Sequence, residues 1–405
     1  MFNYKKYYLF FSMVLLLSFS FACSEAQEII KEVPVEVIKE VPVEVVKEVQ
    51  VEVEKVVEVD KIKEVPVEVI KEVEVIKEVQ VEKVVKEVLE IEKPAGKLVV
   101  YSGRKESLVG PIIEQFQSMT GIEVEVNYGT STEIASQLML EGDKSPADVF
   151  YAQDPGAVGS VVDMLAPLSV DILEPIPDWA KSDQGKWVGV TGRARVLVYN
   201  TDNVSPDDLP LTLNGLCDEK WKGRMGWAPT NSSFQTMVTG MRQIWGEEKT
   251  KEWIECMIAN EVAVYPKNTP QVEAAGKSEI DIGLVNHYYL YKFVLDAGEG
   301  DQFKARNHHL LGGGPGSLVM VSPVAILSTS ENKSNAEQFV TFMTSKIAQN
   351  YFVNNIREYP LIEGVKTHPL ITPMGDIKQP DINLSELADI EGSAKLLQEA
   401  GALPK

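Results

Sequence analysis

Residues 97–128, KLVVYSGRKESLVGPIIEQFQSMTGIEVEVNY, determine the fold class that we expect for this chain. The apolar run 98–101 predicts a buried strand, and the apolar spacing after it predicts a helix over 107–119. Gly121 is placed to end that helix as a C-cap, and the alternation over 122–127 predicts a second strand. A strand, a helix and a strand in this order are typical of an α/β domain with a mainly parallel sheet.

The same alternation continues along the chain. Thr130 and Glu133 have the spacing of a capping box that opens a helix, and residues 147–151 predict a third strand. Ligands of such sheets lie beyond the carboxyl ends of the strands. The first half therefore places the following polar residues near a ligand: Ser102, Arg104, Lys105, Gln153 and Asp154.

The second half has polar residues at comparable positions. The polar stretch 191–195 lies between the apolar runs 188–190 and 196–199 and carries Arg193. Residues 226–234 predict a strand that turns into a helix, whose N-terminal backbone N–H groups can hold an anion. Arg193 and the polar residues at three further strand ends predict an anion pocket: Asn231, Ser232, Ser233, Asn268 and Asn286.

The stretch 280–293, IDIGLVNHYYLYKF, contains two adjacent tyrosines. Inside a strand Tyr288 and Tyr289 would point to opposite faces, but at a strand-to-helix turn they can converge. Two converging phenolates suit a hard, highly charged cation such as ferric iron. The alternative is that both rings are amphipathic packing residues.

The beginning of the chain has the pattern of an export signal. Lys5 and Lys6 precede the apolar run 8–21, and Ala22-Cys23 resembles a lipoprotein cleavage site with Cys23 as the lipidated residue. Because Phe21 fits that site poorly, an ordinary signal or an uncleaved anchor stays open. In each case we expect the mature protein outside the cytoplasm.

Residues 28–93 repeat an eight-residue unit, KEVPVEVI, in which valines alternate with polar residues. An even period and repeated prolines oppose a continuous helix and favour an extended chain. Acidic residues outnumber basic ones there by 19 to 11, and no aromatic residue is available for a core. We interpret the segment as a charged stalk that separates the following domain from a membrane.

Charge and motifs exclude several classes of function. A net charge of −21 disfavours nucleic acid as a partner. The chain has no Gly-x-Ser-x-Gly elbow, no Gly-x-x-x-x-Gly-Lys phosphate loop and no His-Glu-x-x-His motif, so we expect a protein that is not an enzyme. Cys217 and Cys256 can pair in an oxidising compartment, but sequence does not give their distance.

Several of these stretches together resemble the ferric-iron-binding substrate-binding proteins of ABC importers. The resemblance covers about 97–403 and is carried, in order, by VVYSGR, SPADVFYAQD at 145–154, TGRARVLVYNT at 191–201, WKGRMGWAPTNSSFQ at 221–235, YPKN at 265–268, NHYY at 286–289 and REYPL at 357–361.

The resemblance implies a two-lobed periplasmic-binding-protein fold of type II, in which a hinge closes the lobes on the ligand. It implies that Tyr288 and Tyr289 bind Fe(3+). It also implies that the polar residues of the second half hold a synergistic anion such as carbonate, phosphate or citrate: Arg193, Asn231, Ser232, Ser233, Asn268 and Asn286.

The chain departs from the family at three supplementary iron ligands. Lys105 stands where some members have a histidine, Gln153 where they have a glutamate, and Phe234 where others have a third tyrosine. Arg104, Lys105 and Gln153 then become first-lobe contacts of the ligand or its anion. Four residues are candidate replacement ligands: Tyr101, Tyr151, Asp154 and Tyr291.

The expected protein is a lipid-anchored receptor that captures ferric iron, bare or as a chelate, and delivers it to a membrane permease. The alternatives are an anion or small organic solute without iron in the same fold, and a stalked structural surface protein. We expect a monomeric globular part on the outer face of the cytoplasmic membrane, at the cell surface or in the periplasm. The expected regions are a signal peptide at 1–23, a stalk at 24–94, and a binding domain at 95–405 with lobe 1 at about 95–185 and 318–365 and lobe 2 at about 186–317 and 366–405.

Overall fold

The computed structural model describes residues 96–404. The predicted signal peptide, the lipidation site at Cys23 and the repeat segment lie outside these residues. Within 96–404, no helix combines the length and the apolar character that crossing a membrane requires.

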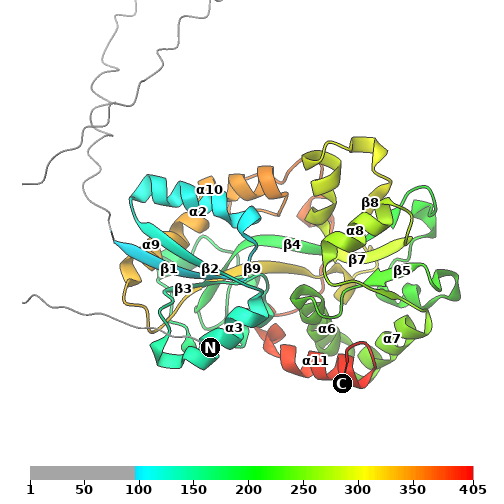
Figure 1. The fold of residues 1–405 in the computed structure, drawn as a ribbon, viewed down its shortest axis with the longest axis horizontal. Coiled ribbons are helices and arrows are strands. Elements are labelled where there is room, and N and C mark those ends of the chain that lie inside the picture. The colour runs from blue at the N-terminus through cyan, green and yellow to red at the C-terminus, as the bar shows by residue number, and fades with distance from the viewer. Residues whose placement is uncertain (1–95, 405) are drawn as a thin grey trace, which may run out of the picture. The chain divides into compact units, whose positions relative to one another are not determined.

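The first lobe is built on β1 (Lys97–Ser102), β2 (Glu123–Tyr128) and β3 (Val149–Tyr151). The strand β1 pairs in parallel with both of the others. Helices cover this sheet: α2 (Glu106–Thr120), α3 (Ser131–Glu141), α9 (Lys333–Met343) and α10 (Lys346–Tyr351) (Figure 1).

Two sequence predictions for this lobe are confirmed in atomic detail. Gly121 ends α2 in the left-handed conformation at φ 71°, which a residue without a Cβ adopts freely. At the start of α3 the Thr130 hydroxyl accepts from the Glu133 backbone N–H, and the Glu133 carboxylate accepts from the Thr130 N–H. This capping box holds α3 against one side of the cleft described below.

Two long strands connect the lobes. The first half of β4 (Trp187–Asn200) pairs with β9 (Val319–Ile326), and its second half pairs with β7 (Ile282–Asn286) and β8 (Ala305–His308). Figure 1 shows β4 and β9 running from one lobe into the other. A register shift between Gly189 and Thr191 interrupts the β4–β9 ladder, and bulges of this kind bend a strand.

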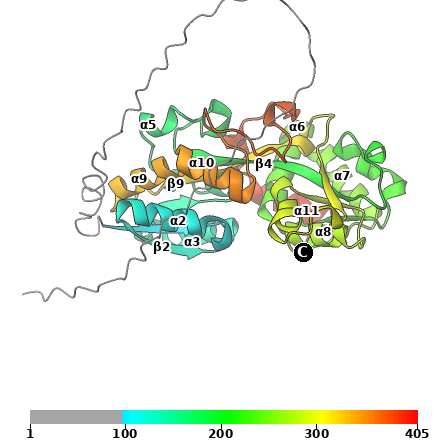
Figure 2. The ribbon, with the colours of Figure 1, turned by 90° about the horizontal axis from the view of Figure 1, so that it is seen from above.

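The second lobe continues the sheet with β5 (Met225–Trp227) and β6 (Ala263–Val264), in the order β4-β7-β5-β6. Its helices are α6 (Ser232–Trp245), α7 (Glu247–Ala259) and α8 (Asn268–Gly276). The last helix, α11 (Ile390–Glu399), packs beside α6 (Figure 1). Seen from above, β4 lies between the two lobes (Figure 2). The described chain also has two short α-helices, α4 (Pro155–Gly159) and α5 (Val170–Leu173).

The prediction of a mainly parallel sheet is only partly correct, because every pair that involves β4 or β9 is antiparallel. The pairs β1–β2, β1–β3, β5–β6 and β5–β7 are parallel, whereas β3–β9, β4–β7, β4–β8 and β4–β9 are antiparallel. The reason is that the two connecting strands enter each parallel sheet from the other lobe. Cys217 and Cys256 form a disulfide in the second lobe, which settles the question that their sequence left open.

Candidate metal centre

The two tyrosines converge where β7 ends. A 3₁₀ turn, His287–Leu290, follows Asn286 directly and brings both rings to one side, with centroids 4.3 Å apart and planes at 29°. Tyr288 is 1 % exposed and Tyr289 is 4 % exposed. The Tyr288 hydroxyl is buried without a hydrogen-bond partner in the described chain, which is uncommon for a phenol. The prediction that a strand-to-helix turn brings these side chains together is therefore confirmed.

The electrostatics around the pair oppose an uncompensated phenolate. Burial, followed by the neighbouring Tyr288, raises the pKa of Tyr289 well above its usual value, while Arg104 and Arg193 act in the opposite direction. A phenolate therefore needs a strong positive partner at this position. A coordinated trivalent cation supplies that charge, and metal affinity then falls with falling pH because protons compete for the oxygens.

His287 fixes the turn that carries the tyrosines. Its Nδ1 accepts from the Ala194 backbone N–H at 3.1 Å, so its Nε2 carries the proton and donates to the Arg357 carbonyl at 2.7 Å. Burial lowers the pKa of His287 to about 3, which keeps the ring neutral in this role. Sequence analysis assigned no role to His287, although it lies next to the tyrosines.

Arg193 is not at a strand end, as the sequence had indicated, but inside the continuous strand β4. Residues 191–195 remain extended because their polar side chains find buried partners. The Nη2 of Arg193 donates to the Val321 carbonyl at 3.3 Å. Two residues further, Arg195 donates to Asn286 Oδ1 at 2.9 Å and to the Leu284 carbonyl at 3.0 Å.

Sequence analysis missed Arg195. Residues i and i+2 of a strand share a face, so the Arg-Ala-Arg spacing was the signal that would have found it. Burial and the adjacent charge of Arg193 lower the pKa of Arg195 to about 9. The two guanidinium groups thus make this face of β4 strongly positive.

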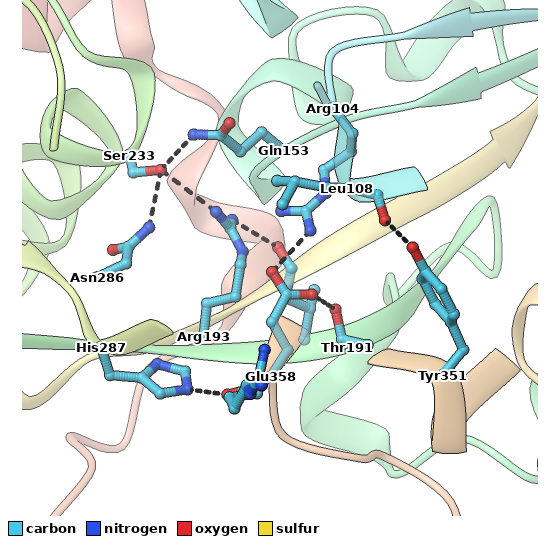
Figure 3. Close-up of polar contacts among 12 residues, drawn as sticks. Arg104, Leu108, Gln153, Thr191, Arg193, Ser233, Asn286, His287, Tyr351 and Glu358 are labelled. Carbon is cyan, nitrogen blue, oxygen red and sulfur yellow. Dashed lines mark hydrogen bonds and ion pairs between the residues drawn. The ribbon is translucent and has the colours of Figure 1, made fainter. Parts of the chain in front are cut away.

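Ser233 joins three other predicted residues. Its hydroxyl oxygen lies 2.9 Å from Gln153 Nε2, 3.4 Å from Arg193 Nη1 and 3.5 Å from Asn286 Nδ2 (Figure 3). Gln153 comes from the first lobe, whereas Ser233 lies in the first turn of α6 in the second. The contact is therefore a direct hydrogen bond across the cleft.

Two further predicted residues, Asn231 and Asn268, have side-chain amide atoms without hydrogen-bond partners in the described chain. Asn231 occupies the N-cap position of α6 without making a side-chain cap, and its Oδ1 is buried and unpaired in the described chain. Asn268 begins α8, is 1 % exposed, and has an unpaired Nδ2. Unpaired buried amide groups in a cleft indicate space for a polar ligand.

A cavity of about 600 Å³ lies between the lobes at these residues. This size is within the range of pockets that bind small organic molecules. The residues that line it come from both lobes and include five of those predicted from sequence: Lys105, Gln153, Asn231, Ser232 and Tyr289.

Arg104 is buried behind the cavity and does not line it. Its Nη2 is 2.7 Å from Glu358 Oε1, and both side chains are fully buried. Glu358 also accepts from the Thr191 hydroxyl at 2.5 Å, so one carboxylate links the first lobe to β4 (Figure 3). The Nε and Nη1 of Arg104 are unpaired, and its Cζ is 6.0 Å from the Tyr288 ring centroid. The role of Glu358, within REYPL at 357–361, was not predicted from the sequence.

Two of the four candidate replacement ligands are engaged elsewhere, since Tyr101 donates to Glu141 at 3.0 Å and Tyr291 donates to the Leu370 carbonyl at 2.7 Å. Asp154 caps α4 through its Oδ1, and its Oδ2 is buried and unpaired in the described chain. The Tyr151 hydroxyl remains buried and unpaired, beside Arg104. Residues 96–404 contain no group of three histidine, cysteine, aspartate or glutamate side chains that could hold a metal ion. Tyrosines are therefore the candidate metal ligands of this cleft.

Comparisons with known proteins agree with this architecture. Residues 111–378 match the family model described as bacterial extracellular solute-binding protein. The chain is 31 % identical over 311 residues to the major ferric iron-binding protein of Neisseria meningitidis serogroup B, covering 75 % of this chain and 92 % of that protein. It is 30 % identical over 309 residues to the Fe(3+)-binding periplasmic protein of Serratia marcescens, covering 76 % and 90 %.

Among solved structures, iron-bound HitA from Pseudomonas aeruginosa superposes with a TM-score of 0.72 at 31 % identity, over 75 % of this chain and 99 % of that one. The lobes, the two connecting strands and the cleft between them therefore form the two-lobed type II binding-protein fold. The family match covers most of the described chain and includes every predicted residue of the second lobe. This chain belongs to the bacterial extracellular solute-binding proteins.

Proposed function

We propose that this protein is the ferric-iron receptor of an ABC importer. Tyr288 and Tyr289 bind the ion, either bare or as a chelate, and the receptor delivers it to a membrane permease. The observation that carries the proposal is the pair of stacked, buried tyrosines at an interlobe cavity, one of them with an unpaired hydroxyl. The names of the relatives, which are ferric iron-binding proteins, support the same ligand.

The synergistic anion binds on the second-lobe side of the cleft. The Asn268 Nδ2 and Arg193 Nε, which are unpaired in the described chain, donate to it, and the α6 N-terminus adds its positive dipole. Asn231 lines the cavity and contributes its amide NH2 group, since its unpaired Oδ1 is an acceptor. Ser233 and Asn286 hold the surrounding network, and Ser232 lines the cavity. Carbonate, phosphate and citrate all suit these donors.

Binding and release follow from opening and closing of the lobes about β4 and β9. The Gln153–Ser233 hydrogen bond stabilises the closed form. We place lobe 1 at about 95–185 and 318–365 and lobe 2 at about 186–317 and 366–405. No covalent change of the ligand is involved, so the protein is a binder and not an enzyme.

The location of the receptor is also part of the proposal. Lipidation of Cys23 anchors the chain to the outer face of the cytoplasmic membrane, and residues 24–94 form the stalk. The globular part acts as a monomer beside the permease.

Iron retention tests the proposal. The mature protein is loaded with ferric citrate and passed over a desalting column, and bound iron is measured by atomic emission. We expect about one iron per chain in the parent and less than a tenth of that in Tyr288→Phe/Tyr289→Phe. The matched control is Tyr128→Phe/Tyr265→Phe, two half-buried tyrosines that are not among the lining residues of the cavity, which should retain iron. Equal retention in both double variants would refute the assignment.

A further inference from the structure

Two lysines line the cleft cavity and a third lies beside the tyrosines, each from a different element. Lys105 precedes α2, Lys267 precedes α8, and Lys292 begins the π-helical turn Lys292–Asp296 after the tyrosines. Lys105 and Lys267 line the same cavity as Tyr289, and Lys292 Nζ is 5.9 Å from the Tyr289 ring centroid. Within 96–404 none of the three forms an ion pair.

The three ammonium groups are close enough to influence one another. Partial burial lowers the pKa of Lys105, and the charges of Lys292 and then Lys267 lower it further. Like charges that converge without a counter-ion are unfavourable. Because the whole chain carries a net charge of −21, this local excess of positive charge is opposite to the general composition.

The cavity wall holds one carboxylate beside this cluster. Hydrogen bonds from Thr130, and then the charge of Lys267, lower the pKa of Glu133, which accepts from the Thr130 N–H at 2.8 Å in the capping box. Among the lining side chains Glu133 is the acidic residue, so positive charge stays in excess at the three lysines. Glu358 is held by Arg104, and Asp296 is held by Arg357. Arg193 Nε and Asn268 Nδ2 are further buried donors without a partner in the described chain.

These charges are unsuited to a bare cation. Lysines repel a ferric ion, and none of them is a ligand for a hard trivalent metal while it is protonated. They attract an anion, and a cavity of about 600 Å³ is far larger than one carbonate. Charged side chains at a cleft mouth also raise the rate of encounter with ligands of opposite charge.

We propose that Lys105, Lys267 and Lys292 recognise the carboxylates of an organic chelator, so that the ligand of this cleft is an anionic ferric polycarboxylate. The tyrosines hold the iron and the lysines hold the chelator. The first lobe then contributes positive charge at Lys105 in place of a metal ligand. This inference rests on the proposed function, because it assumes that Tyr288 and Tyr289 bind the iron.

The test compares two iron donors on the mature protein. Ferric citrate carries iron on carboxylates, whereas ferric acetohydroxamate carries it without any. For Lys105→Ala/Lys267→Ala/Lys292→Ala we expect the Kd for ferric citrate to rise at least tenfold, while the Kd for iron from acetohydroxamate changes less than threefold. Raising salt should weaken ferric citrate binding by the parent more than by the variant, since screening acts on the lysines.

The control variant also removes three lysine charges, but at positions outside the cleft cavity. Lys144, Lys333 and Lys366 are exposed, outside the cleft cavity, and without an ion pair in the described chain. Their triple alanine variant should bind both donors as the parent does. Substituting arginine for the three cleft lysines should keep at least half of the preference for ferric citrate.

Two results would overturn the inference. One is an unchanged ferric citrate Kd in the cleft variant, and the other is an equal loss for both donors. If the parent itself binds iron from neither donor, the proposed function fails and the inference fails with it. If the parent binds both and the cleft variant is unchanged, only the inference fails. Thermal unfolding of each variant, monitored by circular dichroism, shows that the fold is intact.

Discussion

The imidazole of His287 accepts a hydrogen bond from the backbone N–H of Ala194 at 3.1 Å, and this contact ties the tyrosine turn to the strand that connects the lobes. Through its other nitrogen His287 reaches the Arg357 carbonyl. Arg357 has φ 66°, a left-handed conformation that side chains adopt at a cost, and it directly precedes Glu358. The turn, β4 and the segment around Glu358 are thus held together at one point.

We expect His287→Phe to lower the free energy of unfolding by about 2–4 kcal/mol, because it leaves a buried N–H and a buried carbonyl without partners. Iron affinity should fall as well, since the tyrosine turn loses its anchor. Urea unfolding and iron titration measure the two effects. The matched control is His308→Phe, which removes a single long contact to the Pro210 carbonyl at 3.3 Å. Equal, small effects of the two substitutions would contradict the anchoring role.

Glu358 is expected to be more important for stability than any exposed acid. Its loss leaves the Arg104 charge buried without its partner, so Glu358→Gln should cost about 3–5 kcal/mol in the free energy of unfolding. Arg104→Met/Glu358→Met should cost less than Glu358→Gln alone. The control is Glu255→Gln, in an exposed pair with Lys251, for which we expect less than about 0.5 kcal/mol. Chemical denaturation distinguishes these outcomes.

His309 should destabilise the protein in acid. Burial, and then the neighbouring His308, lower its pKa from 6.5 to about 4. The unfolded chain therefore binds a proton at a pH where the folded chain does not, so stability falls as the pH drops from about 6.5 towards 4 and does not change from this group above 6.5. The expected slope is up to about 1 kcal/mol per pH unit. His309→Gln should reduce that slope in unfolding experiments at pH 7, 6 and 5, and an unchanged slope would contradict the assignment.

The disulfide between Cys217 and Cys256 should stabilise the second lobe without affecting the ligand. It joins residues 39 apart in sequence, and a loop of that size corresponds to about 3–4 kcal/mol of lost chain entropy in the unfolded state. Cys217→Ala/Cys256→Ala should therefore unfold at lower denaturant while keeping the parent's iron affinity. A large loss of affinity at low temperature would show that the bridge also shapes the site.

Local signals in the sequence predicted much of the fold. The capping box at Thr130, the C-cap at Gly121 and the turn that brings Tyr288 and Tyr289 together all depend on residues a few positions apart. The prediction of a strand end at 191–195 was wrong because the extended conformation of this stretch depends on distant partners such as Asn286 and Val321. Periodicity cannot show such partners.

The roles of Glu358 and His287 were not predicted for the same reason, because their contacts join distant segments of the chain. Glu358 is 254 positions from Arg104, and His287 is 93 positions from Ala194. Neither contact leaves a local pattern, since the fold alone brings the segments together. The converging lysines at 105, 267 and 292 are a similar case, as each has the sequence context of an ordinary surface lysine.

Visible absorption shows whether the two tyrosines bind ferric iron. Because the Tyr288 hydroxyl has no partner, its removal should leave the free energy of unfolding unchanged or slightly higher. The mature protein, titrated with ferric citrate at neutral pH, should develop a tyrosinate-to-iron charge-transfer band that saturates near one iron per chain. The Tyr288→Phe/Tyr289→Phe variant should be equally stable and should lack the band. A parent protein that shows no band at saturating iron, or a variant that keeps the band, would contradict the assignment of Tyr288 and Tyr289 as iron ligands.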